Sequence, residues 1–67
     1  MTVFEIYESE LSTQLLEAMH ASTVSMAKNL KTLGYYPKEL LGWQFKLAGA
    51  IDLRKQSEAE KRMAYAN

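Results

Sequence analysis

A glutamate and a histidine three residues apart form the one pair in this chain whose spacing is known from metal chemistry. Glu17 and His20 would lie on one face of a helix, and Glu-x-x-His pairs recur in helical bundles that hold two carboxylate-bridged metal ions. Those sites also need inward-projecting glutamates from other helices, whereas the chain has no glutamate between Glu39 and Glu58. We therefore interpret the pair as solvated and expect no metal and no cofactor.

Residues that could carry out covalent catalysis are scarce. The chain has no cysteine and a single histidine, and its serines have no clear base partner. Gly42 and Gly49 have neither a preceding strand nor the spacing of a phosphate-binding loop. The missing cysteine also excludes disulfides and thiolate metal sites. We expect a protein that is not an enzyme.

Basic residues of the second half form an alternative functional surface. All four charged residues before Lys28 are acidic, and the rest of the chain nets four positive charges. Positive charge suits phosphate binding, but interleaved glutamates weaken the field, and the two halves complement each other electrically. A nucleic-acid-binding regulator is therefore the alternative function. Its candidate residues are Lys46, Arg54, Lys55, Lys61 and Arg62, with Trp43 available for stacking.

All these residues are positioned by two helices that meet at one corner of the chain. Gly34 suits the left-handed conformation that ends a helix, and Pro37 suits the first position of the next helix. Apolar residues recur with a helical period on both sides of this corner. The sequence thus predicts an all-α fold with a hairpin of two long antiparallel helices. The predicted elements are a helix over 9–33, a turn over 34–36, and a helix over 37–65 that ends in a polar tail.

The first eight residues predict a short helical arm. Thr2 followed by Glu5 has the form of a capping box, which indicates a short helix in residues 1–8 and a kink near Ser9. The β-branched and aromatic residues of 3–7 also suit a strand, although a lone strand would have nothing to pair with. Because repeats and linkers are absent, we expect residues 1–67 to form one domain.

The lengths of the apolar runs and the character of the N-terminal residues indicate where in the cell the protein is located. No apolar run approaches the roughly 20 residues of a membrane span, and the N-terminus lacks the basic start and apolar middle of a signal peptide. We therefore expect a cytoplasmic protein without a membrane partner. Short helical chains without cysteine are a size class that includes viral inhibitors and accessory proteins of phages, which is a hypothesis about context only.

The second long helix has more apolar surface than one neighbouring helix covers. A chain of this size also buries only about 60% of its unfolded surface. Its small core gives marginal stability, so further stabilising contacts are needed. We therefore predict self-association, with a dimer completing a helical bundle, and binding to a larger protein partner. The expected partner-binding residues are Trp43 at the centre, Gly42, Lys46, Gly49, Ala50 and Leu53 beside it, and Phe45 on the opposite flank.

Overall fold

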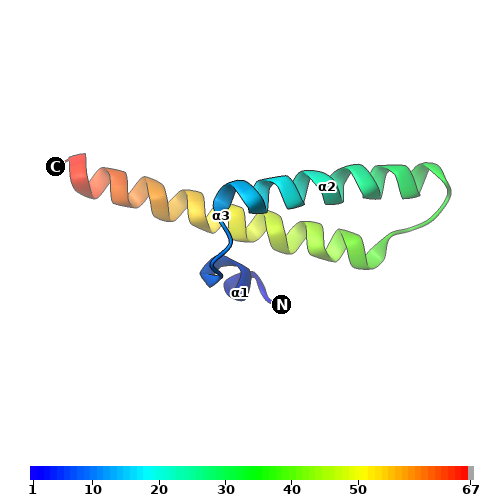
Figure 1. Ribbon diagram of the computed structural model, residues 1–67, viewed down its shortest axis with the longest axis horizontal. Coiled ribbons are helices and arrows are strands. Elements are labelled where there is room, and N and C mark those ends of the chain that lie inside the picture. The colour runs from blue at the N-terminus through cyan, green and yellow to red at the C-terminus, as the bar shows by residue number, and fades with distance from the viewer. Residues whose placement is uncertain (67) are drawn as a thin grey trace.

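The fold is a helical hairpin with a short third helix. The computed structural model describes the backbone of residues 1–66 and the side chains of residues 1–61. Its helices are α1 (Val3–Glu8), α2 (Thr13–Thr32) and α3 (Lys38–Ala66). Residues 1–66 contain no strand, so the predicted all-α fold with two long helices is confirmed. Figure 1 shows α2 running back along the first part of α3, whose C-terminal turns extend beyond α2.

The N-terminal arm is helical because its capping residues pair as the sequence predicts. The Thr2 hydroxyl accepts a hydrogen bond of 3.2 Å from the Glu5 backbone N–H, and the Glu5 carboxylate accepts one of 3.1 Å from the Thr2 N–H. This reciprocal capping box satisfies two backbone donors that the helix itself cannot pair. The alternative of a strand in this segment is therefore wrong.

The first long helix begins later than predicted. It starts at Thr13, with Ser12 as the N-cap that accepts a bond of 3.0 Å from the Leu15 N–H. Ser9, the expected cap, instead ends α1, because its N–H and its hydroxyl both donate to the Ile6 carbonyl, at 3.2 and 2.7 Å. Residues 9–12 are therefore the link between α1 and α2.

The corner at Gly34 forms as its residues predict. Gly34 has a φ of +88°, its N–H donates to the Lys31 carbonyl at 3.0 Å, and the Tyr35 N–H donates to the Leu30 carbonyl at 3.0 Å. These two bonds are those of a Schellman motif, which ends α2. The next helix begins one residue after Pro37, whose carbonyl accepts the Leu41 N–H at 2.9 Å. From there α3 continues unbroken to Ala66.

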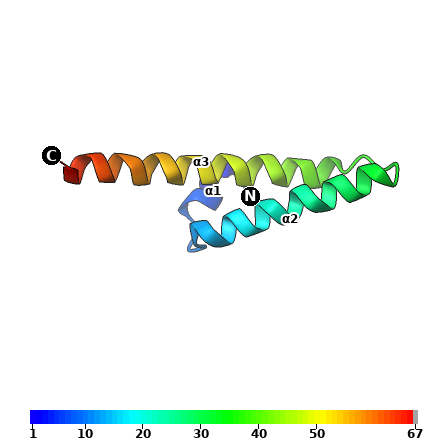
Figure 2. The ribbon, with the colours of Figure 1, turned by 90° about the horizontal axis from the view of Figure 1, so that it is seen from above.

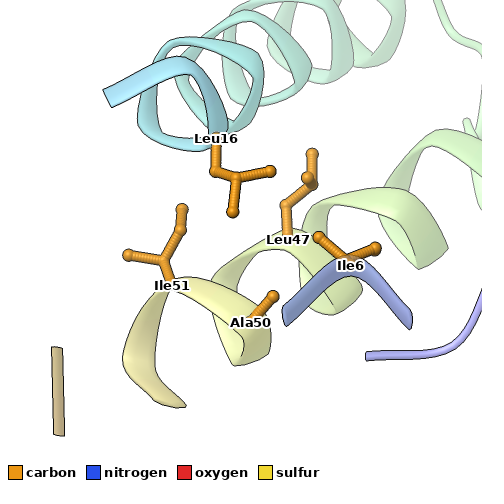
Figure 3. Close-up of a cluster of buried hydrophobic side chains, with 5 residues drawn as sticks. All are labelled: Ile6, Leu16, Leu47, Ala50 and Ile51. Carbon is orange, nitrogen blue, oxygen red and sulfur yellow. The ribbon is translucent and has the colours of Figure 1, made fainter. Parts of the chain in front are cut away.

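The core lies at one end of the hairpin. Figure 2 shows α2 and α3 close together at the turn and farther apart near the start of α2, with α1 at the wider end. There a buried cluster, the core cluster, contains side chains from all three helices (Figure 3). Its members are Ile6, Leu16, Leu47, Ala50 and Ile51. The section of the hairpin toward the turn has no third helix among residues 1–66, and the molecule is elongated, at 53 × 20 × 14 Å.

Candidate functional site

An open groove lies between α2 and α3 beside the core cluster. Its first section has a volume of about 480 Å³. Leu47 belongs to both the groove and the core cluster, and Met19 packs against that cluster. Helix α1, which contributes Ile6 to the cluster, therefore stands at this end of the groove. The lining residues are Leu15, Ala18, Met19, Ser22 and Thr23 of α2 and Leu40, Trp43 and Leu47 of α3.

The groove continues toward the turn in a second section of about 580 Å³. Leu40 and Trp43 line both sections, so the two sections adjoin at these two side chains. Met26 and Leu30 supply its α2 wall, and Tyr36 closes it at the turn. Two charged residues, Lys38 and Glu39, line this second section, whereas no charged residue lines the first. We call the two sections together the groove.

Large apolar side chains of the groove are open to water. Trp43 is 39% exposed, Leu15 45% and Met26 53%. By contrast, Leu16, the neighbour of Leu15, is completely buried in the core cluster. Exposed apolar surface of this kind costs about 25 cal/mol per Å² relative to burial. Covering these side chains with another apolar surface would therefore be favourable.

Lys46 and Gly42 lie beside Trp43 at the edge of the groove. The Lys46 ammonium lies 5.8 Å from the centroid of the indole ring, within the range of a cation–π contact. Gly42 lines a shallow concavity with both side chains, and a Cβ added at Gly42 would meet no described heavy atom within 4 Å. Trp43, Lys46 and Gly42, three of the predicted partner-binding residues, therefore lie together at this edge.

Two other predicted partner-binding residues pack within the chain, Ala50 in the core and the half-buried Gly49 against α1. Ala50 is completely buried in the core cluster. A Cβ added at Gly49 would lie 3.3 Å from Cγ1 of Val3, so the close approach that this glycine permits is that of α1. The interpretation of Ala50 and Gly49 as exposed contacts for another molecule is therefore corrected, because α1 covers this flank of α3.

The last two predicted residues lie outside the groove lining. Leu53 is half-buried, one residue before the arginine that contacts α1. Phe45 is 73% exposed and lies two residues from Trp43, which places it on the opposite side of α3. Phe45 is therefore a separate exposed aromatic residue and a natural control for groove experiments.

Arg54 contacts α1 rather than solvent alone. Its Nε donates to the Tyr7 carbonyl at 3.1 Å, and Nη2 donates to the carbonyls of Ile6 at 3.3 Å and Ser9 at 2.9 Å. Its Nη1 also donates to the carbonyl of Leu11. The sequence analysis considered this arginine only as a phosphate ligand, because no local signal pairs it with residues more than forty positions away.

Three of the remaining basic and acidic candidates lie together on the surface, Glu17, His20 and Lys55. The Lys55 ammonium lies 3.5 Å from the Glu17 carboxylate, and both side chains are exposed. Glu17 and His20 share a shallow pocket with Lys55. Among the side chains of residues 1–61, no group of three or more histidine, aspartate or glutamate residues is placed to hold a metal ion. Lys61 is exposed, and the side chain of Arg62 lies outside the described residues.

The α2 wall of the groove was not identified from the sequence. The apolar stripe of this helix includes Leu15 and Met26, and a stripe of this kind is normally assigned to the core. Leu16 and Ala27, each one position farther along, are buried instead. The signal that could have revealed the groove is the width of this apolar stripe, which is more than α3 alone covers.

Comparisons with known proteins add no relative. No family model matches the chain, and no curated protein or solved structure is significantly similar to it. Over the residues that the structure describes, none of the helices has both the length and the apolar character needed to cross a membrane. The function is therefore inferred from the chemistry of the groove.

Proposed function

We propose that this chain is a non-enzymatic helical interaction protein whose groove binds the apolar face of a partner helix. The observation that carries the proposal is the pair of adjoining, mainly apolar sections of the groove, which share Trp43. Amphipathic helices commonly bind in grooves of this kind, with anchors at i, i+3 or i+4, and i+7. Tryptophan is also the residue type most often found to dominate the affinity of such interfaces.

The dimensions of the groove suit one helix. Leu15 and Leu30, at its two ends on α2, are separated by about 22 Å of helix, which corresponds to roughly four turns of a bound partner. Ala18 and Ser22 present small side chains between them, so a partner backbone can approach closely. The Thr23 hydroxyl donates to the His20 carbonyl at 2.7 Å, which reduces the cost of covering it with an apolar helix.

The proposal includes completion of the fold by another chain. A helix from a second copy and a helix from a larger protein can both present an apolar face to the groove. Either one would cover Trp43, Leu15 and Met26. The nucleic-acid alternative has less support, because Arg54 is engaged by backbone carbonyls and Lys55 lies beside Glu17.

A display experiment tests groove binding directly. The immobilised protein is offered a library of displayed helical peptides with randomised faces, and we expect the enriched peptides to be apolar at i, i+3 or i+4, and i+7. Binding should be lost in Leu15→Glu and retained in Phe45→Glu, which adds the same charge on the opposite side of α3. Equal loss of binding in both variants, or no enrichment by a protein that sedimentation shows to be monomeric, would contradict the proposal.

A further inference from the structure

The turn between α2 and α3 exposes three large side chains at one end of the elongated molecule (Figure 1). We call residues 33–37, which join the two helices, the tip. Leu33 is 71% exposed, and Tyr35 and Tyr36 are exposed to a similar degree. Leucine is favoured outside water, and tyrosine combines an apolar ring with a polar hydroxyl. The tip therefore presents one apolar and two amphipathic side chains.

The backbone of the tip already pairs most of its hydrogen-bond donors. The N–H groups of Leu33, Gly34 and Tyr35 donate to carbonyls in the last turns of α2 at 3.0 to 3.2 Å. Pro37 has no N–H, and it is buried, which anchors the tip to the hairpin. Removing an unpaired backbone N–H from water is costly. The tip can therefore enter a less polar environment at a small cost and without a change of shape.

Positive charge flanks the tip on both helices. Lys28 and Lys31 precede it and line a concavity on one face of the hairpin. Lys38 follows it and lines the second section of the groove, on the other face. All three side chains are exposed. Residues 18–51 contain four lysines in all and a single acidic residue, Glu39, so the part of the hairpin that carries the tip has a net positive charge.

From these observations we infer that the tip docks on the surface of an anionic lipid bilayer. Leu33 enters the boundary between headgroups and acyl chains, and the tyrosine rings lie at the level of the headgroups. The three lysines lie beside anionic headgroups. This contact is peripheral, and it goes beyond the proposed function of the groove. It replaces the expectation of no membrane partner, which considered only a spanning segment and a signal peptide.

Leu33 distinguishes a lipid surface from other anionic partners. Lysine and tyrosine side chains also suit single-stranded nucleic acid, through phosphate contacts and base stacking. Leucine contributes to neither contact, whereas it gains from burial at a lipid interface. The exposed phenylalanines lack this combination, because Phe4 is followed by Glu5 and Phe45 lies about two turns into α3. Phe45 is therefore a matched control for Leu33.

Co-sedimentation with lipid vesicles tests the inference. The full chain is mixed with phosphatidylcholine vesicles that contain phosphatidylserine or lack it, and binding should require phosphatidylserine. Because each lysine near such a surface strengthens binding about fivefold, the variant with both Lys28→Gln and Lys31→Gln should bind about 20-fold more weakly. Leu33→Ser should weaken binding about fivefold or more, and Phe45→Ser should leave it unchanged. Circular dichroism checks that the variants retain their helix content.

Two results of this experiment would overturn the inference. One is equal binding, or no binding, to the two kinds of vesicle. The other is a Leu33→Ser variant that binds anionic vesicles as tightly as the unmodified chain does. Leu15→Glu, which changes the groove at the far end of α2, should still bind vesicles, so loss of groove binding and loss of vesicle binding are separate outcomes.

A fluorescent probe identifies the part of the molecule that enters the interface. Because the chain has no cysteine, Leu33→Cys and Phe45→Cys can each be labelled at one site with an environment-sensitive apolar fluorophore. On addition of anionic vesicles, the emission at position 33 should shift to shorter wavelength, and the emission at position 45 should not. A shift at position 45 alone would show that a different surface docks.

A single-stranded oligonucleotide provides the competing outcome. It is offered to the same variants at the same salt concentration, and we expect it to bind more weakly than anionic vesicles do. If the oligonucleotide binds more tightly than vesicles and its binding needs Lys28 and Lys31 but not Leu33, the tip is a nucleic-acid site and the inference of a lipid surface is wrong.

Discussion

The guanidinium group of Arg54 lies at the C-terminal end of α1, where its Nε donates a hydrogen bond of 3.1 Å to the carbonyl of Tyr7. The carbonyls of Ile6 and Ser9 also accept from it. The last carbonyls of a helix have no partner within the helix, and a cation is favourable near them. One side chain of α3 therefore both caps α1 and holds it against the hairpin.

Replacement of Arg54 should release this end of α1. We expect Arg54→Met to lower the free energy of unfolding by about 1.5–3 kcal/mol, because several backbone carbonyls lose a charged donor at once. Urea unfolding followed by circular dichroism measures the change. The matched control is Lys55→Met, which removes only an exposed ion pair with Glu17 and should cost at most about 0.5 kcal/mol. Equal effects of the two substitutions would show that the Arg54 bonds do not hold α1.

The two glycines of α3 should respond differently to alanine. At Gly42 an added Cβ meets no described atom within 4 Å, so Gly42→Ala should stabilise the protein by about 0.5–1 kcal/mol through reduced chain entropy. At Gly49 the same change meets Val3 at 3.3 Å, so the gain should be smaller or reversed. Unfolding is measured at low concentration, where a dimer does not contribute.

A double-mutant cycle separates contact from helix propensity. If the Val3 contact limits the gain at Gly49, Gly49→Ala should stabilise the Val3→Ala background more than it stabilises the unmodified chain. The same background should not change the effect of Gly42→Ala. An identical effect of Gly49→Ala in both backgrounds would show that α1 does not press on this position.

Acid should weaken the cap of α1. Hydrogen bonds from the backbone N–H and the hydroxyl of Thr2 lower the pKa of Glu5 below its ordinary value of 4.5. A lowered folded-state pKa means that the ionised carboxylate favours folding above pH 4.5 and that this contribution is lost as the pH falls through the lowered pKa. An NMR titration of the Glu5 carboxyl carbon checks the shift. Acid should increase the fraying of α1 in the unmodified protein as Glu5 becomes protonated. Glu5→Gln keeps a capping side chain without its charge, so this acid-induced increase should be absent in the variant.

Local signals in the sequence predicted the elements but not their packing. Capping at Thr2 and the turn at Gly34 act within a few residues, so the short arm and the corner could be inferred from residue type alone. The position of α1 on α3 depends on the contact between Val3 and Gly49, which lie far apart in the chain. The periodicity of α3 shows that a flank needs cover but not which segment covers it.

The candidate site was predicted on one side only. Trp43 was predicted because it lies on a flank of α3 that one neighbouring helix does not cover and because tryptophan often dominates interfaces, whereas Leu15 belongs to an apolar stripe that was assigned to the core. Leu15 and Leu16 are adjacent and both apolar, but Leu16 is buried in the core cluster whereas Leu15 lines the groove. Such a choice between neighbouring residues depends on tertiary packing rather than on pattern.

Trp43 is the chain's single tryptophan and therefore a reporter for the groove. At 39% exposure, its fluorescence should resemble that of a partly hydrated indole when the protein is dilute. If a second copy covers the groove, the emission maximum should shift to shorter wavelength and quenching by acrylamide should fall as the protein concentration rises. In Leu15→Glu the emission should stay at its dilute value throughout, while Phe45→Glu should follow the unmodified chain. Emission that does not change with concentration, in a sample shown by sedimentation to be dimeric, would place the dimer interface away from Trp43.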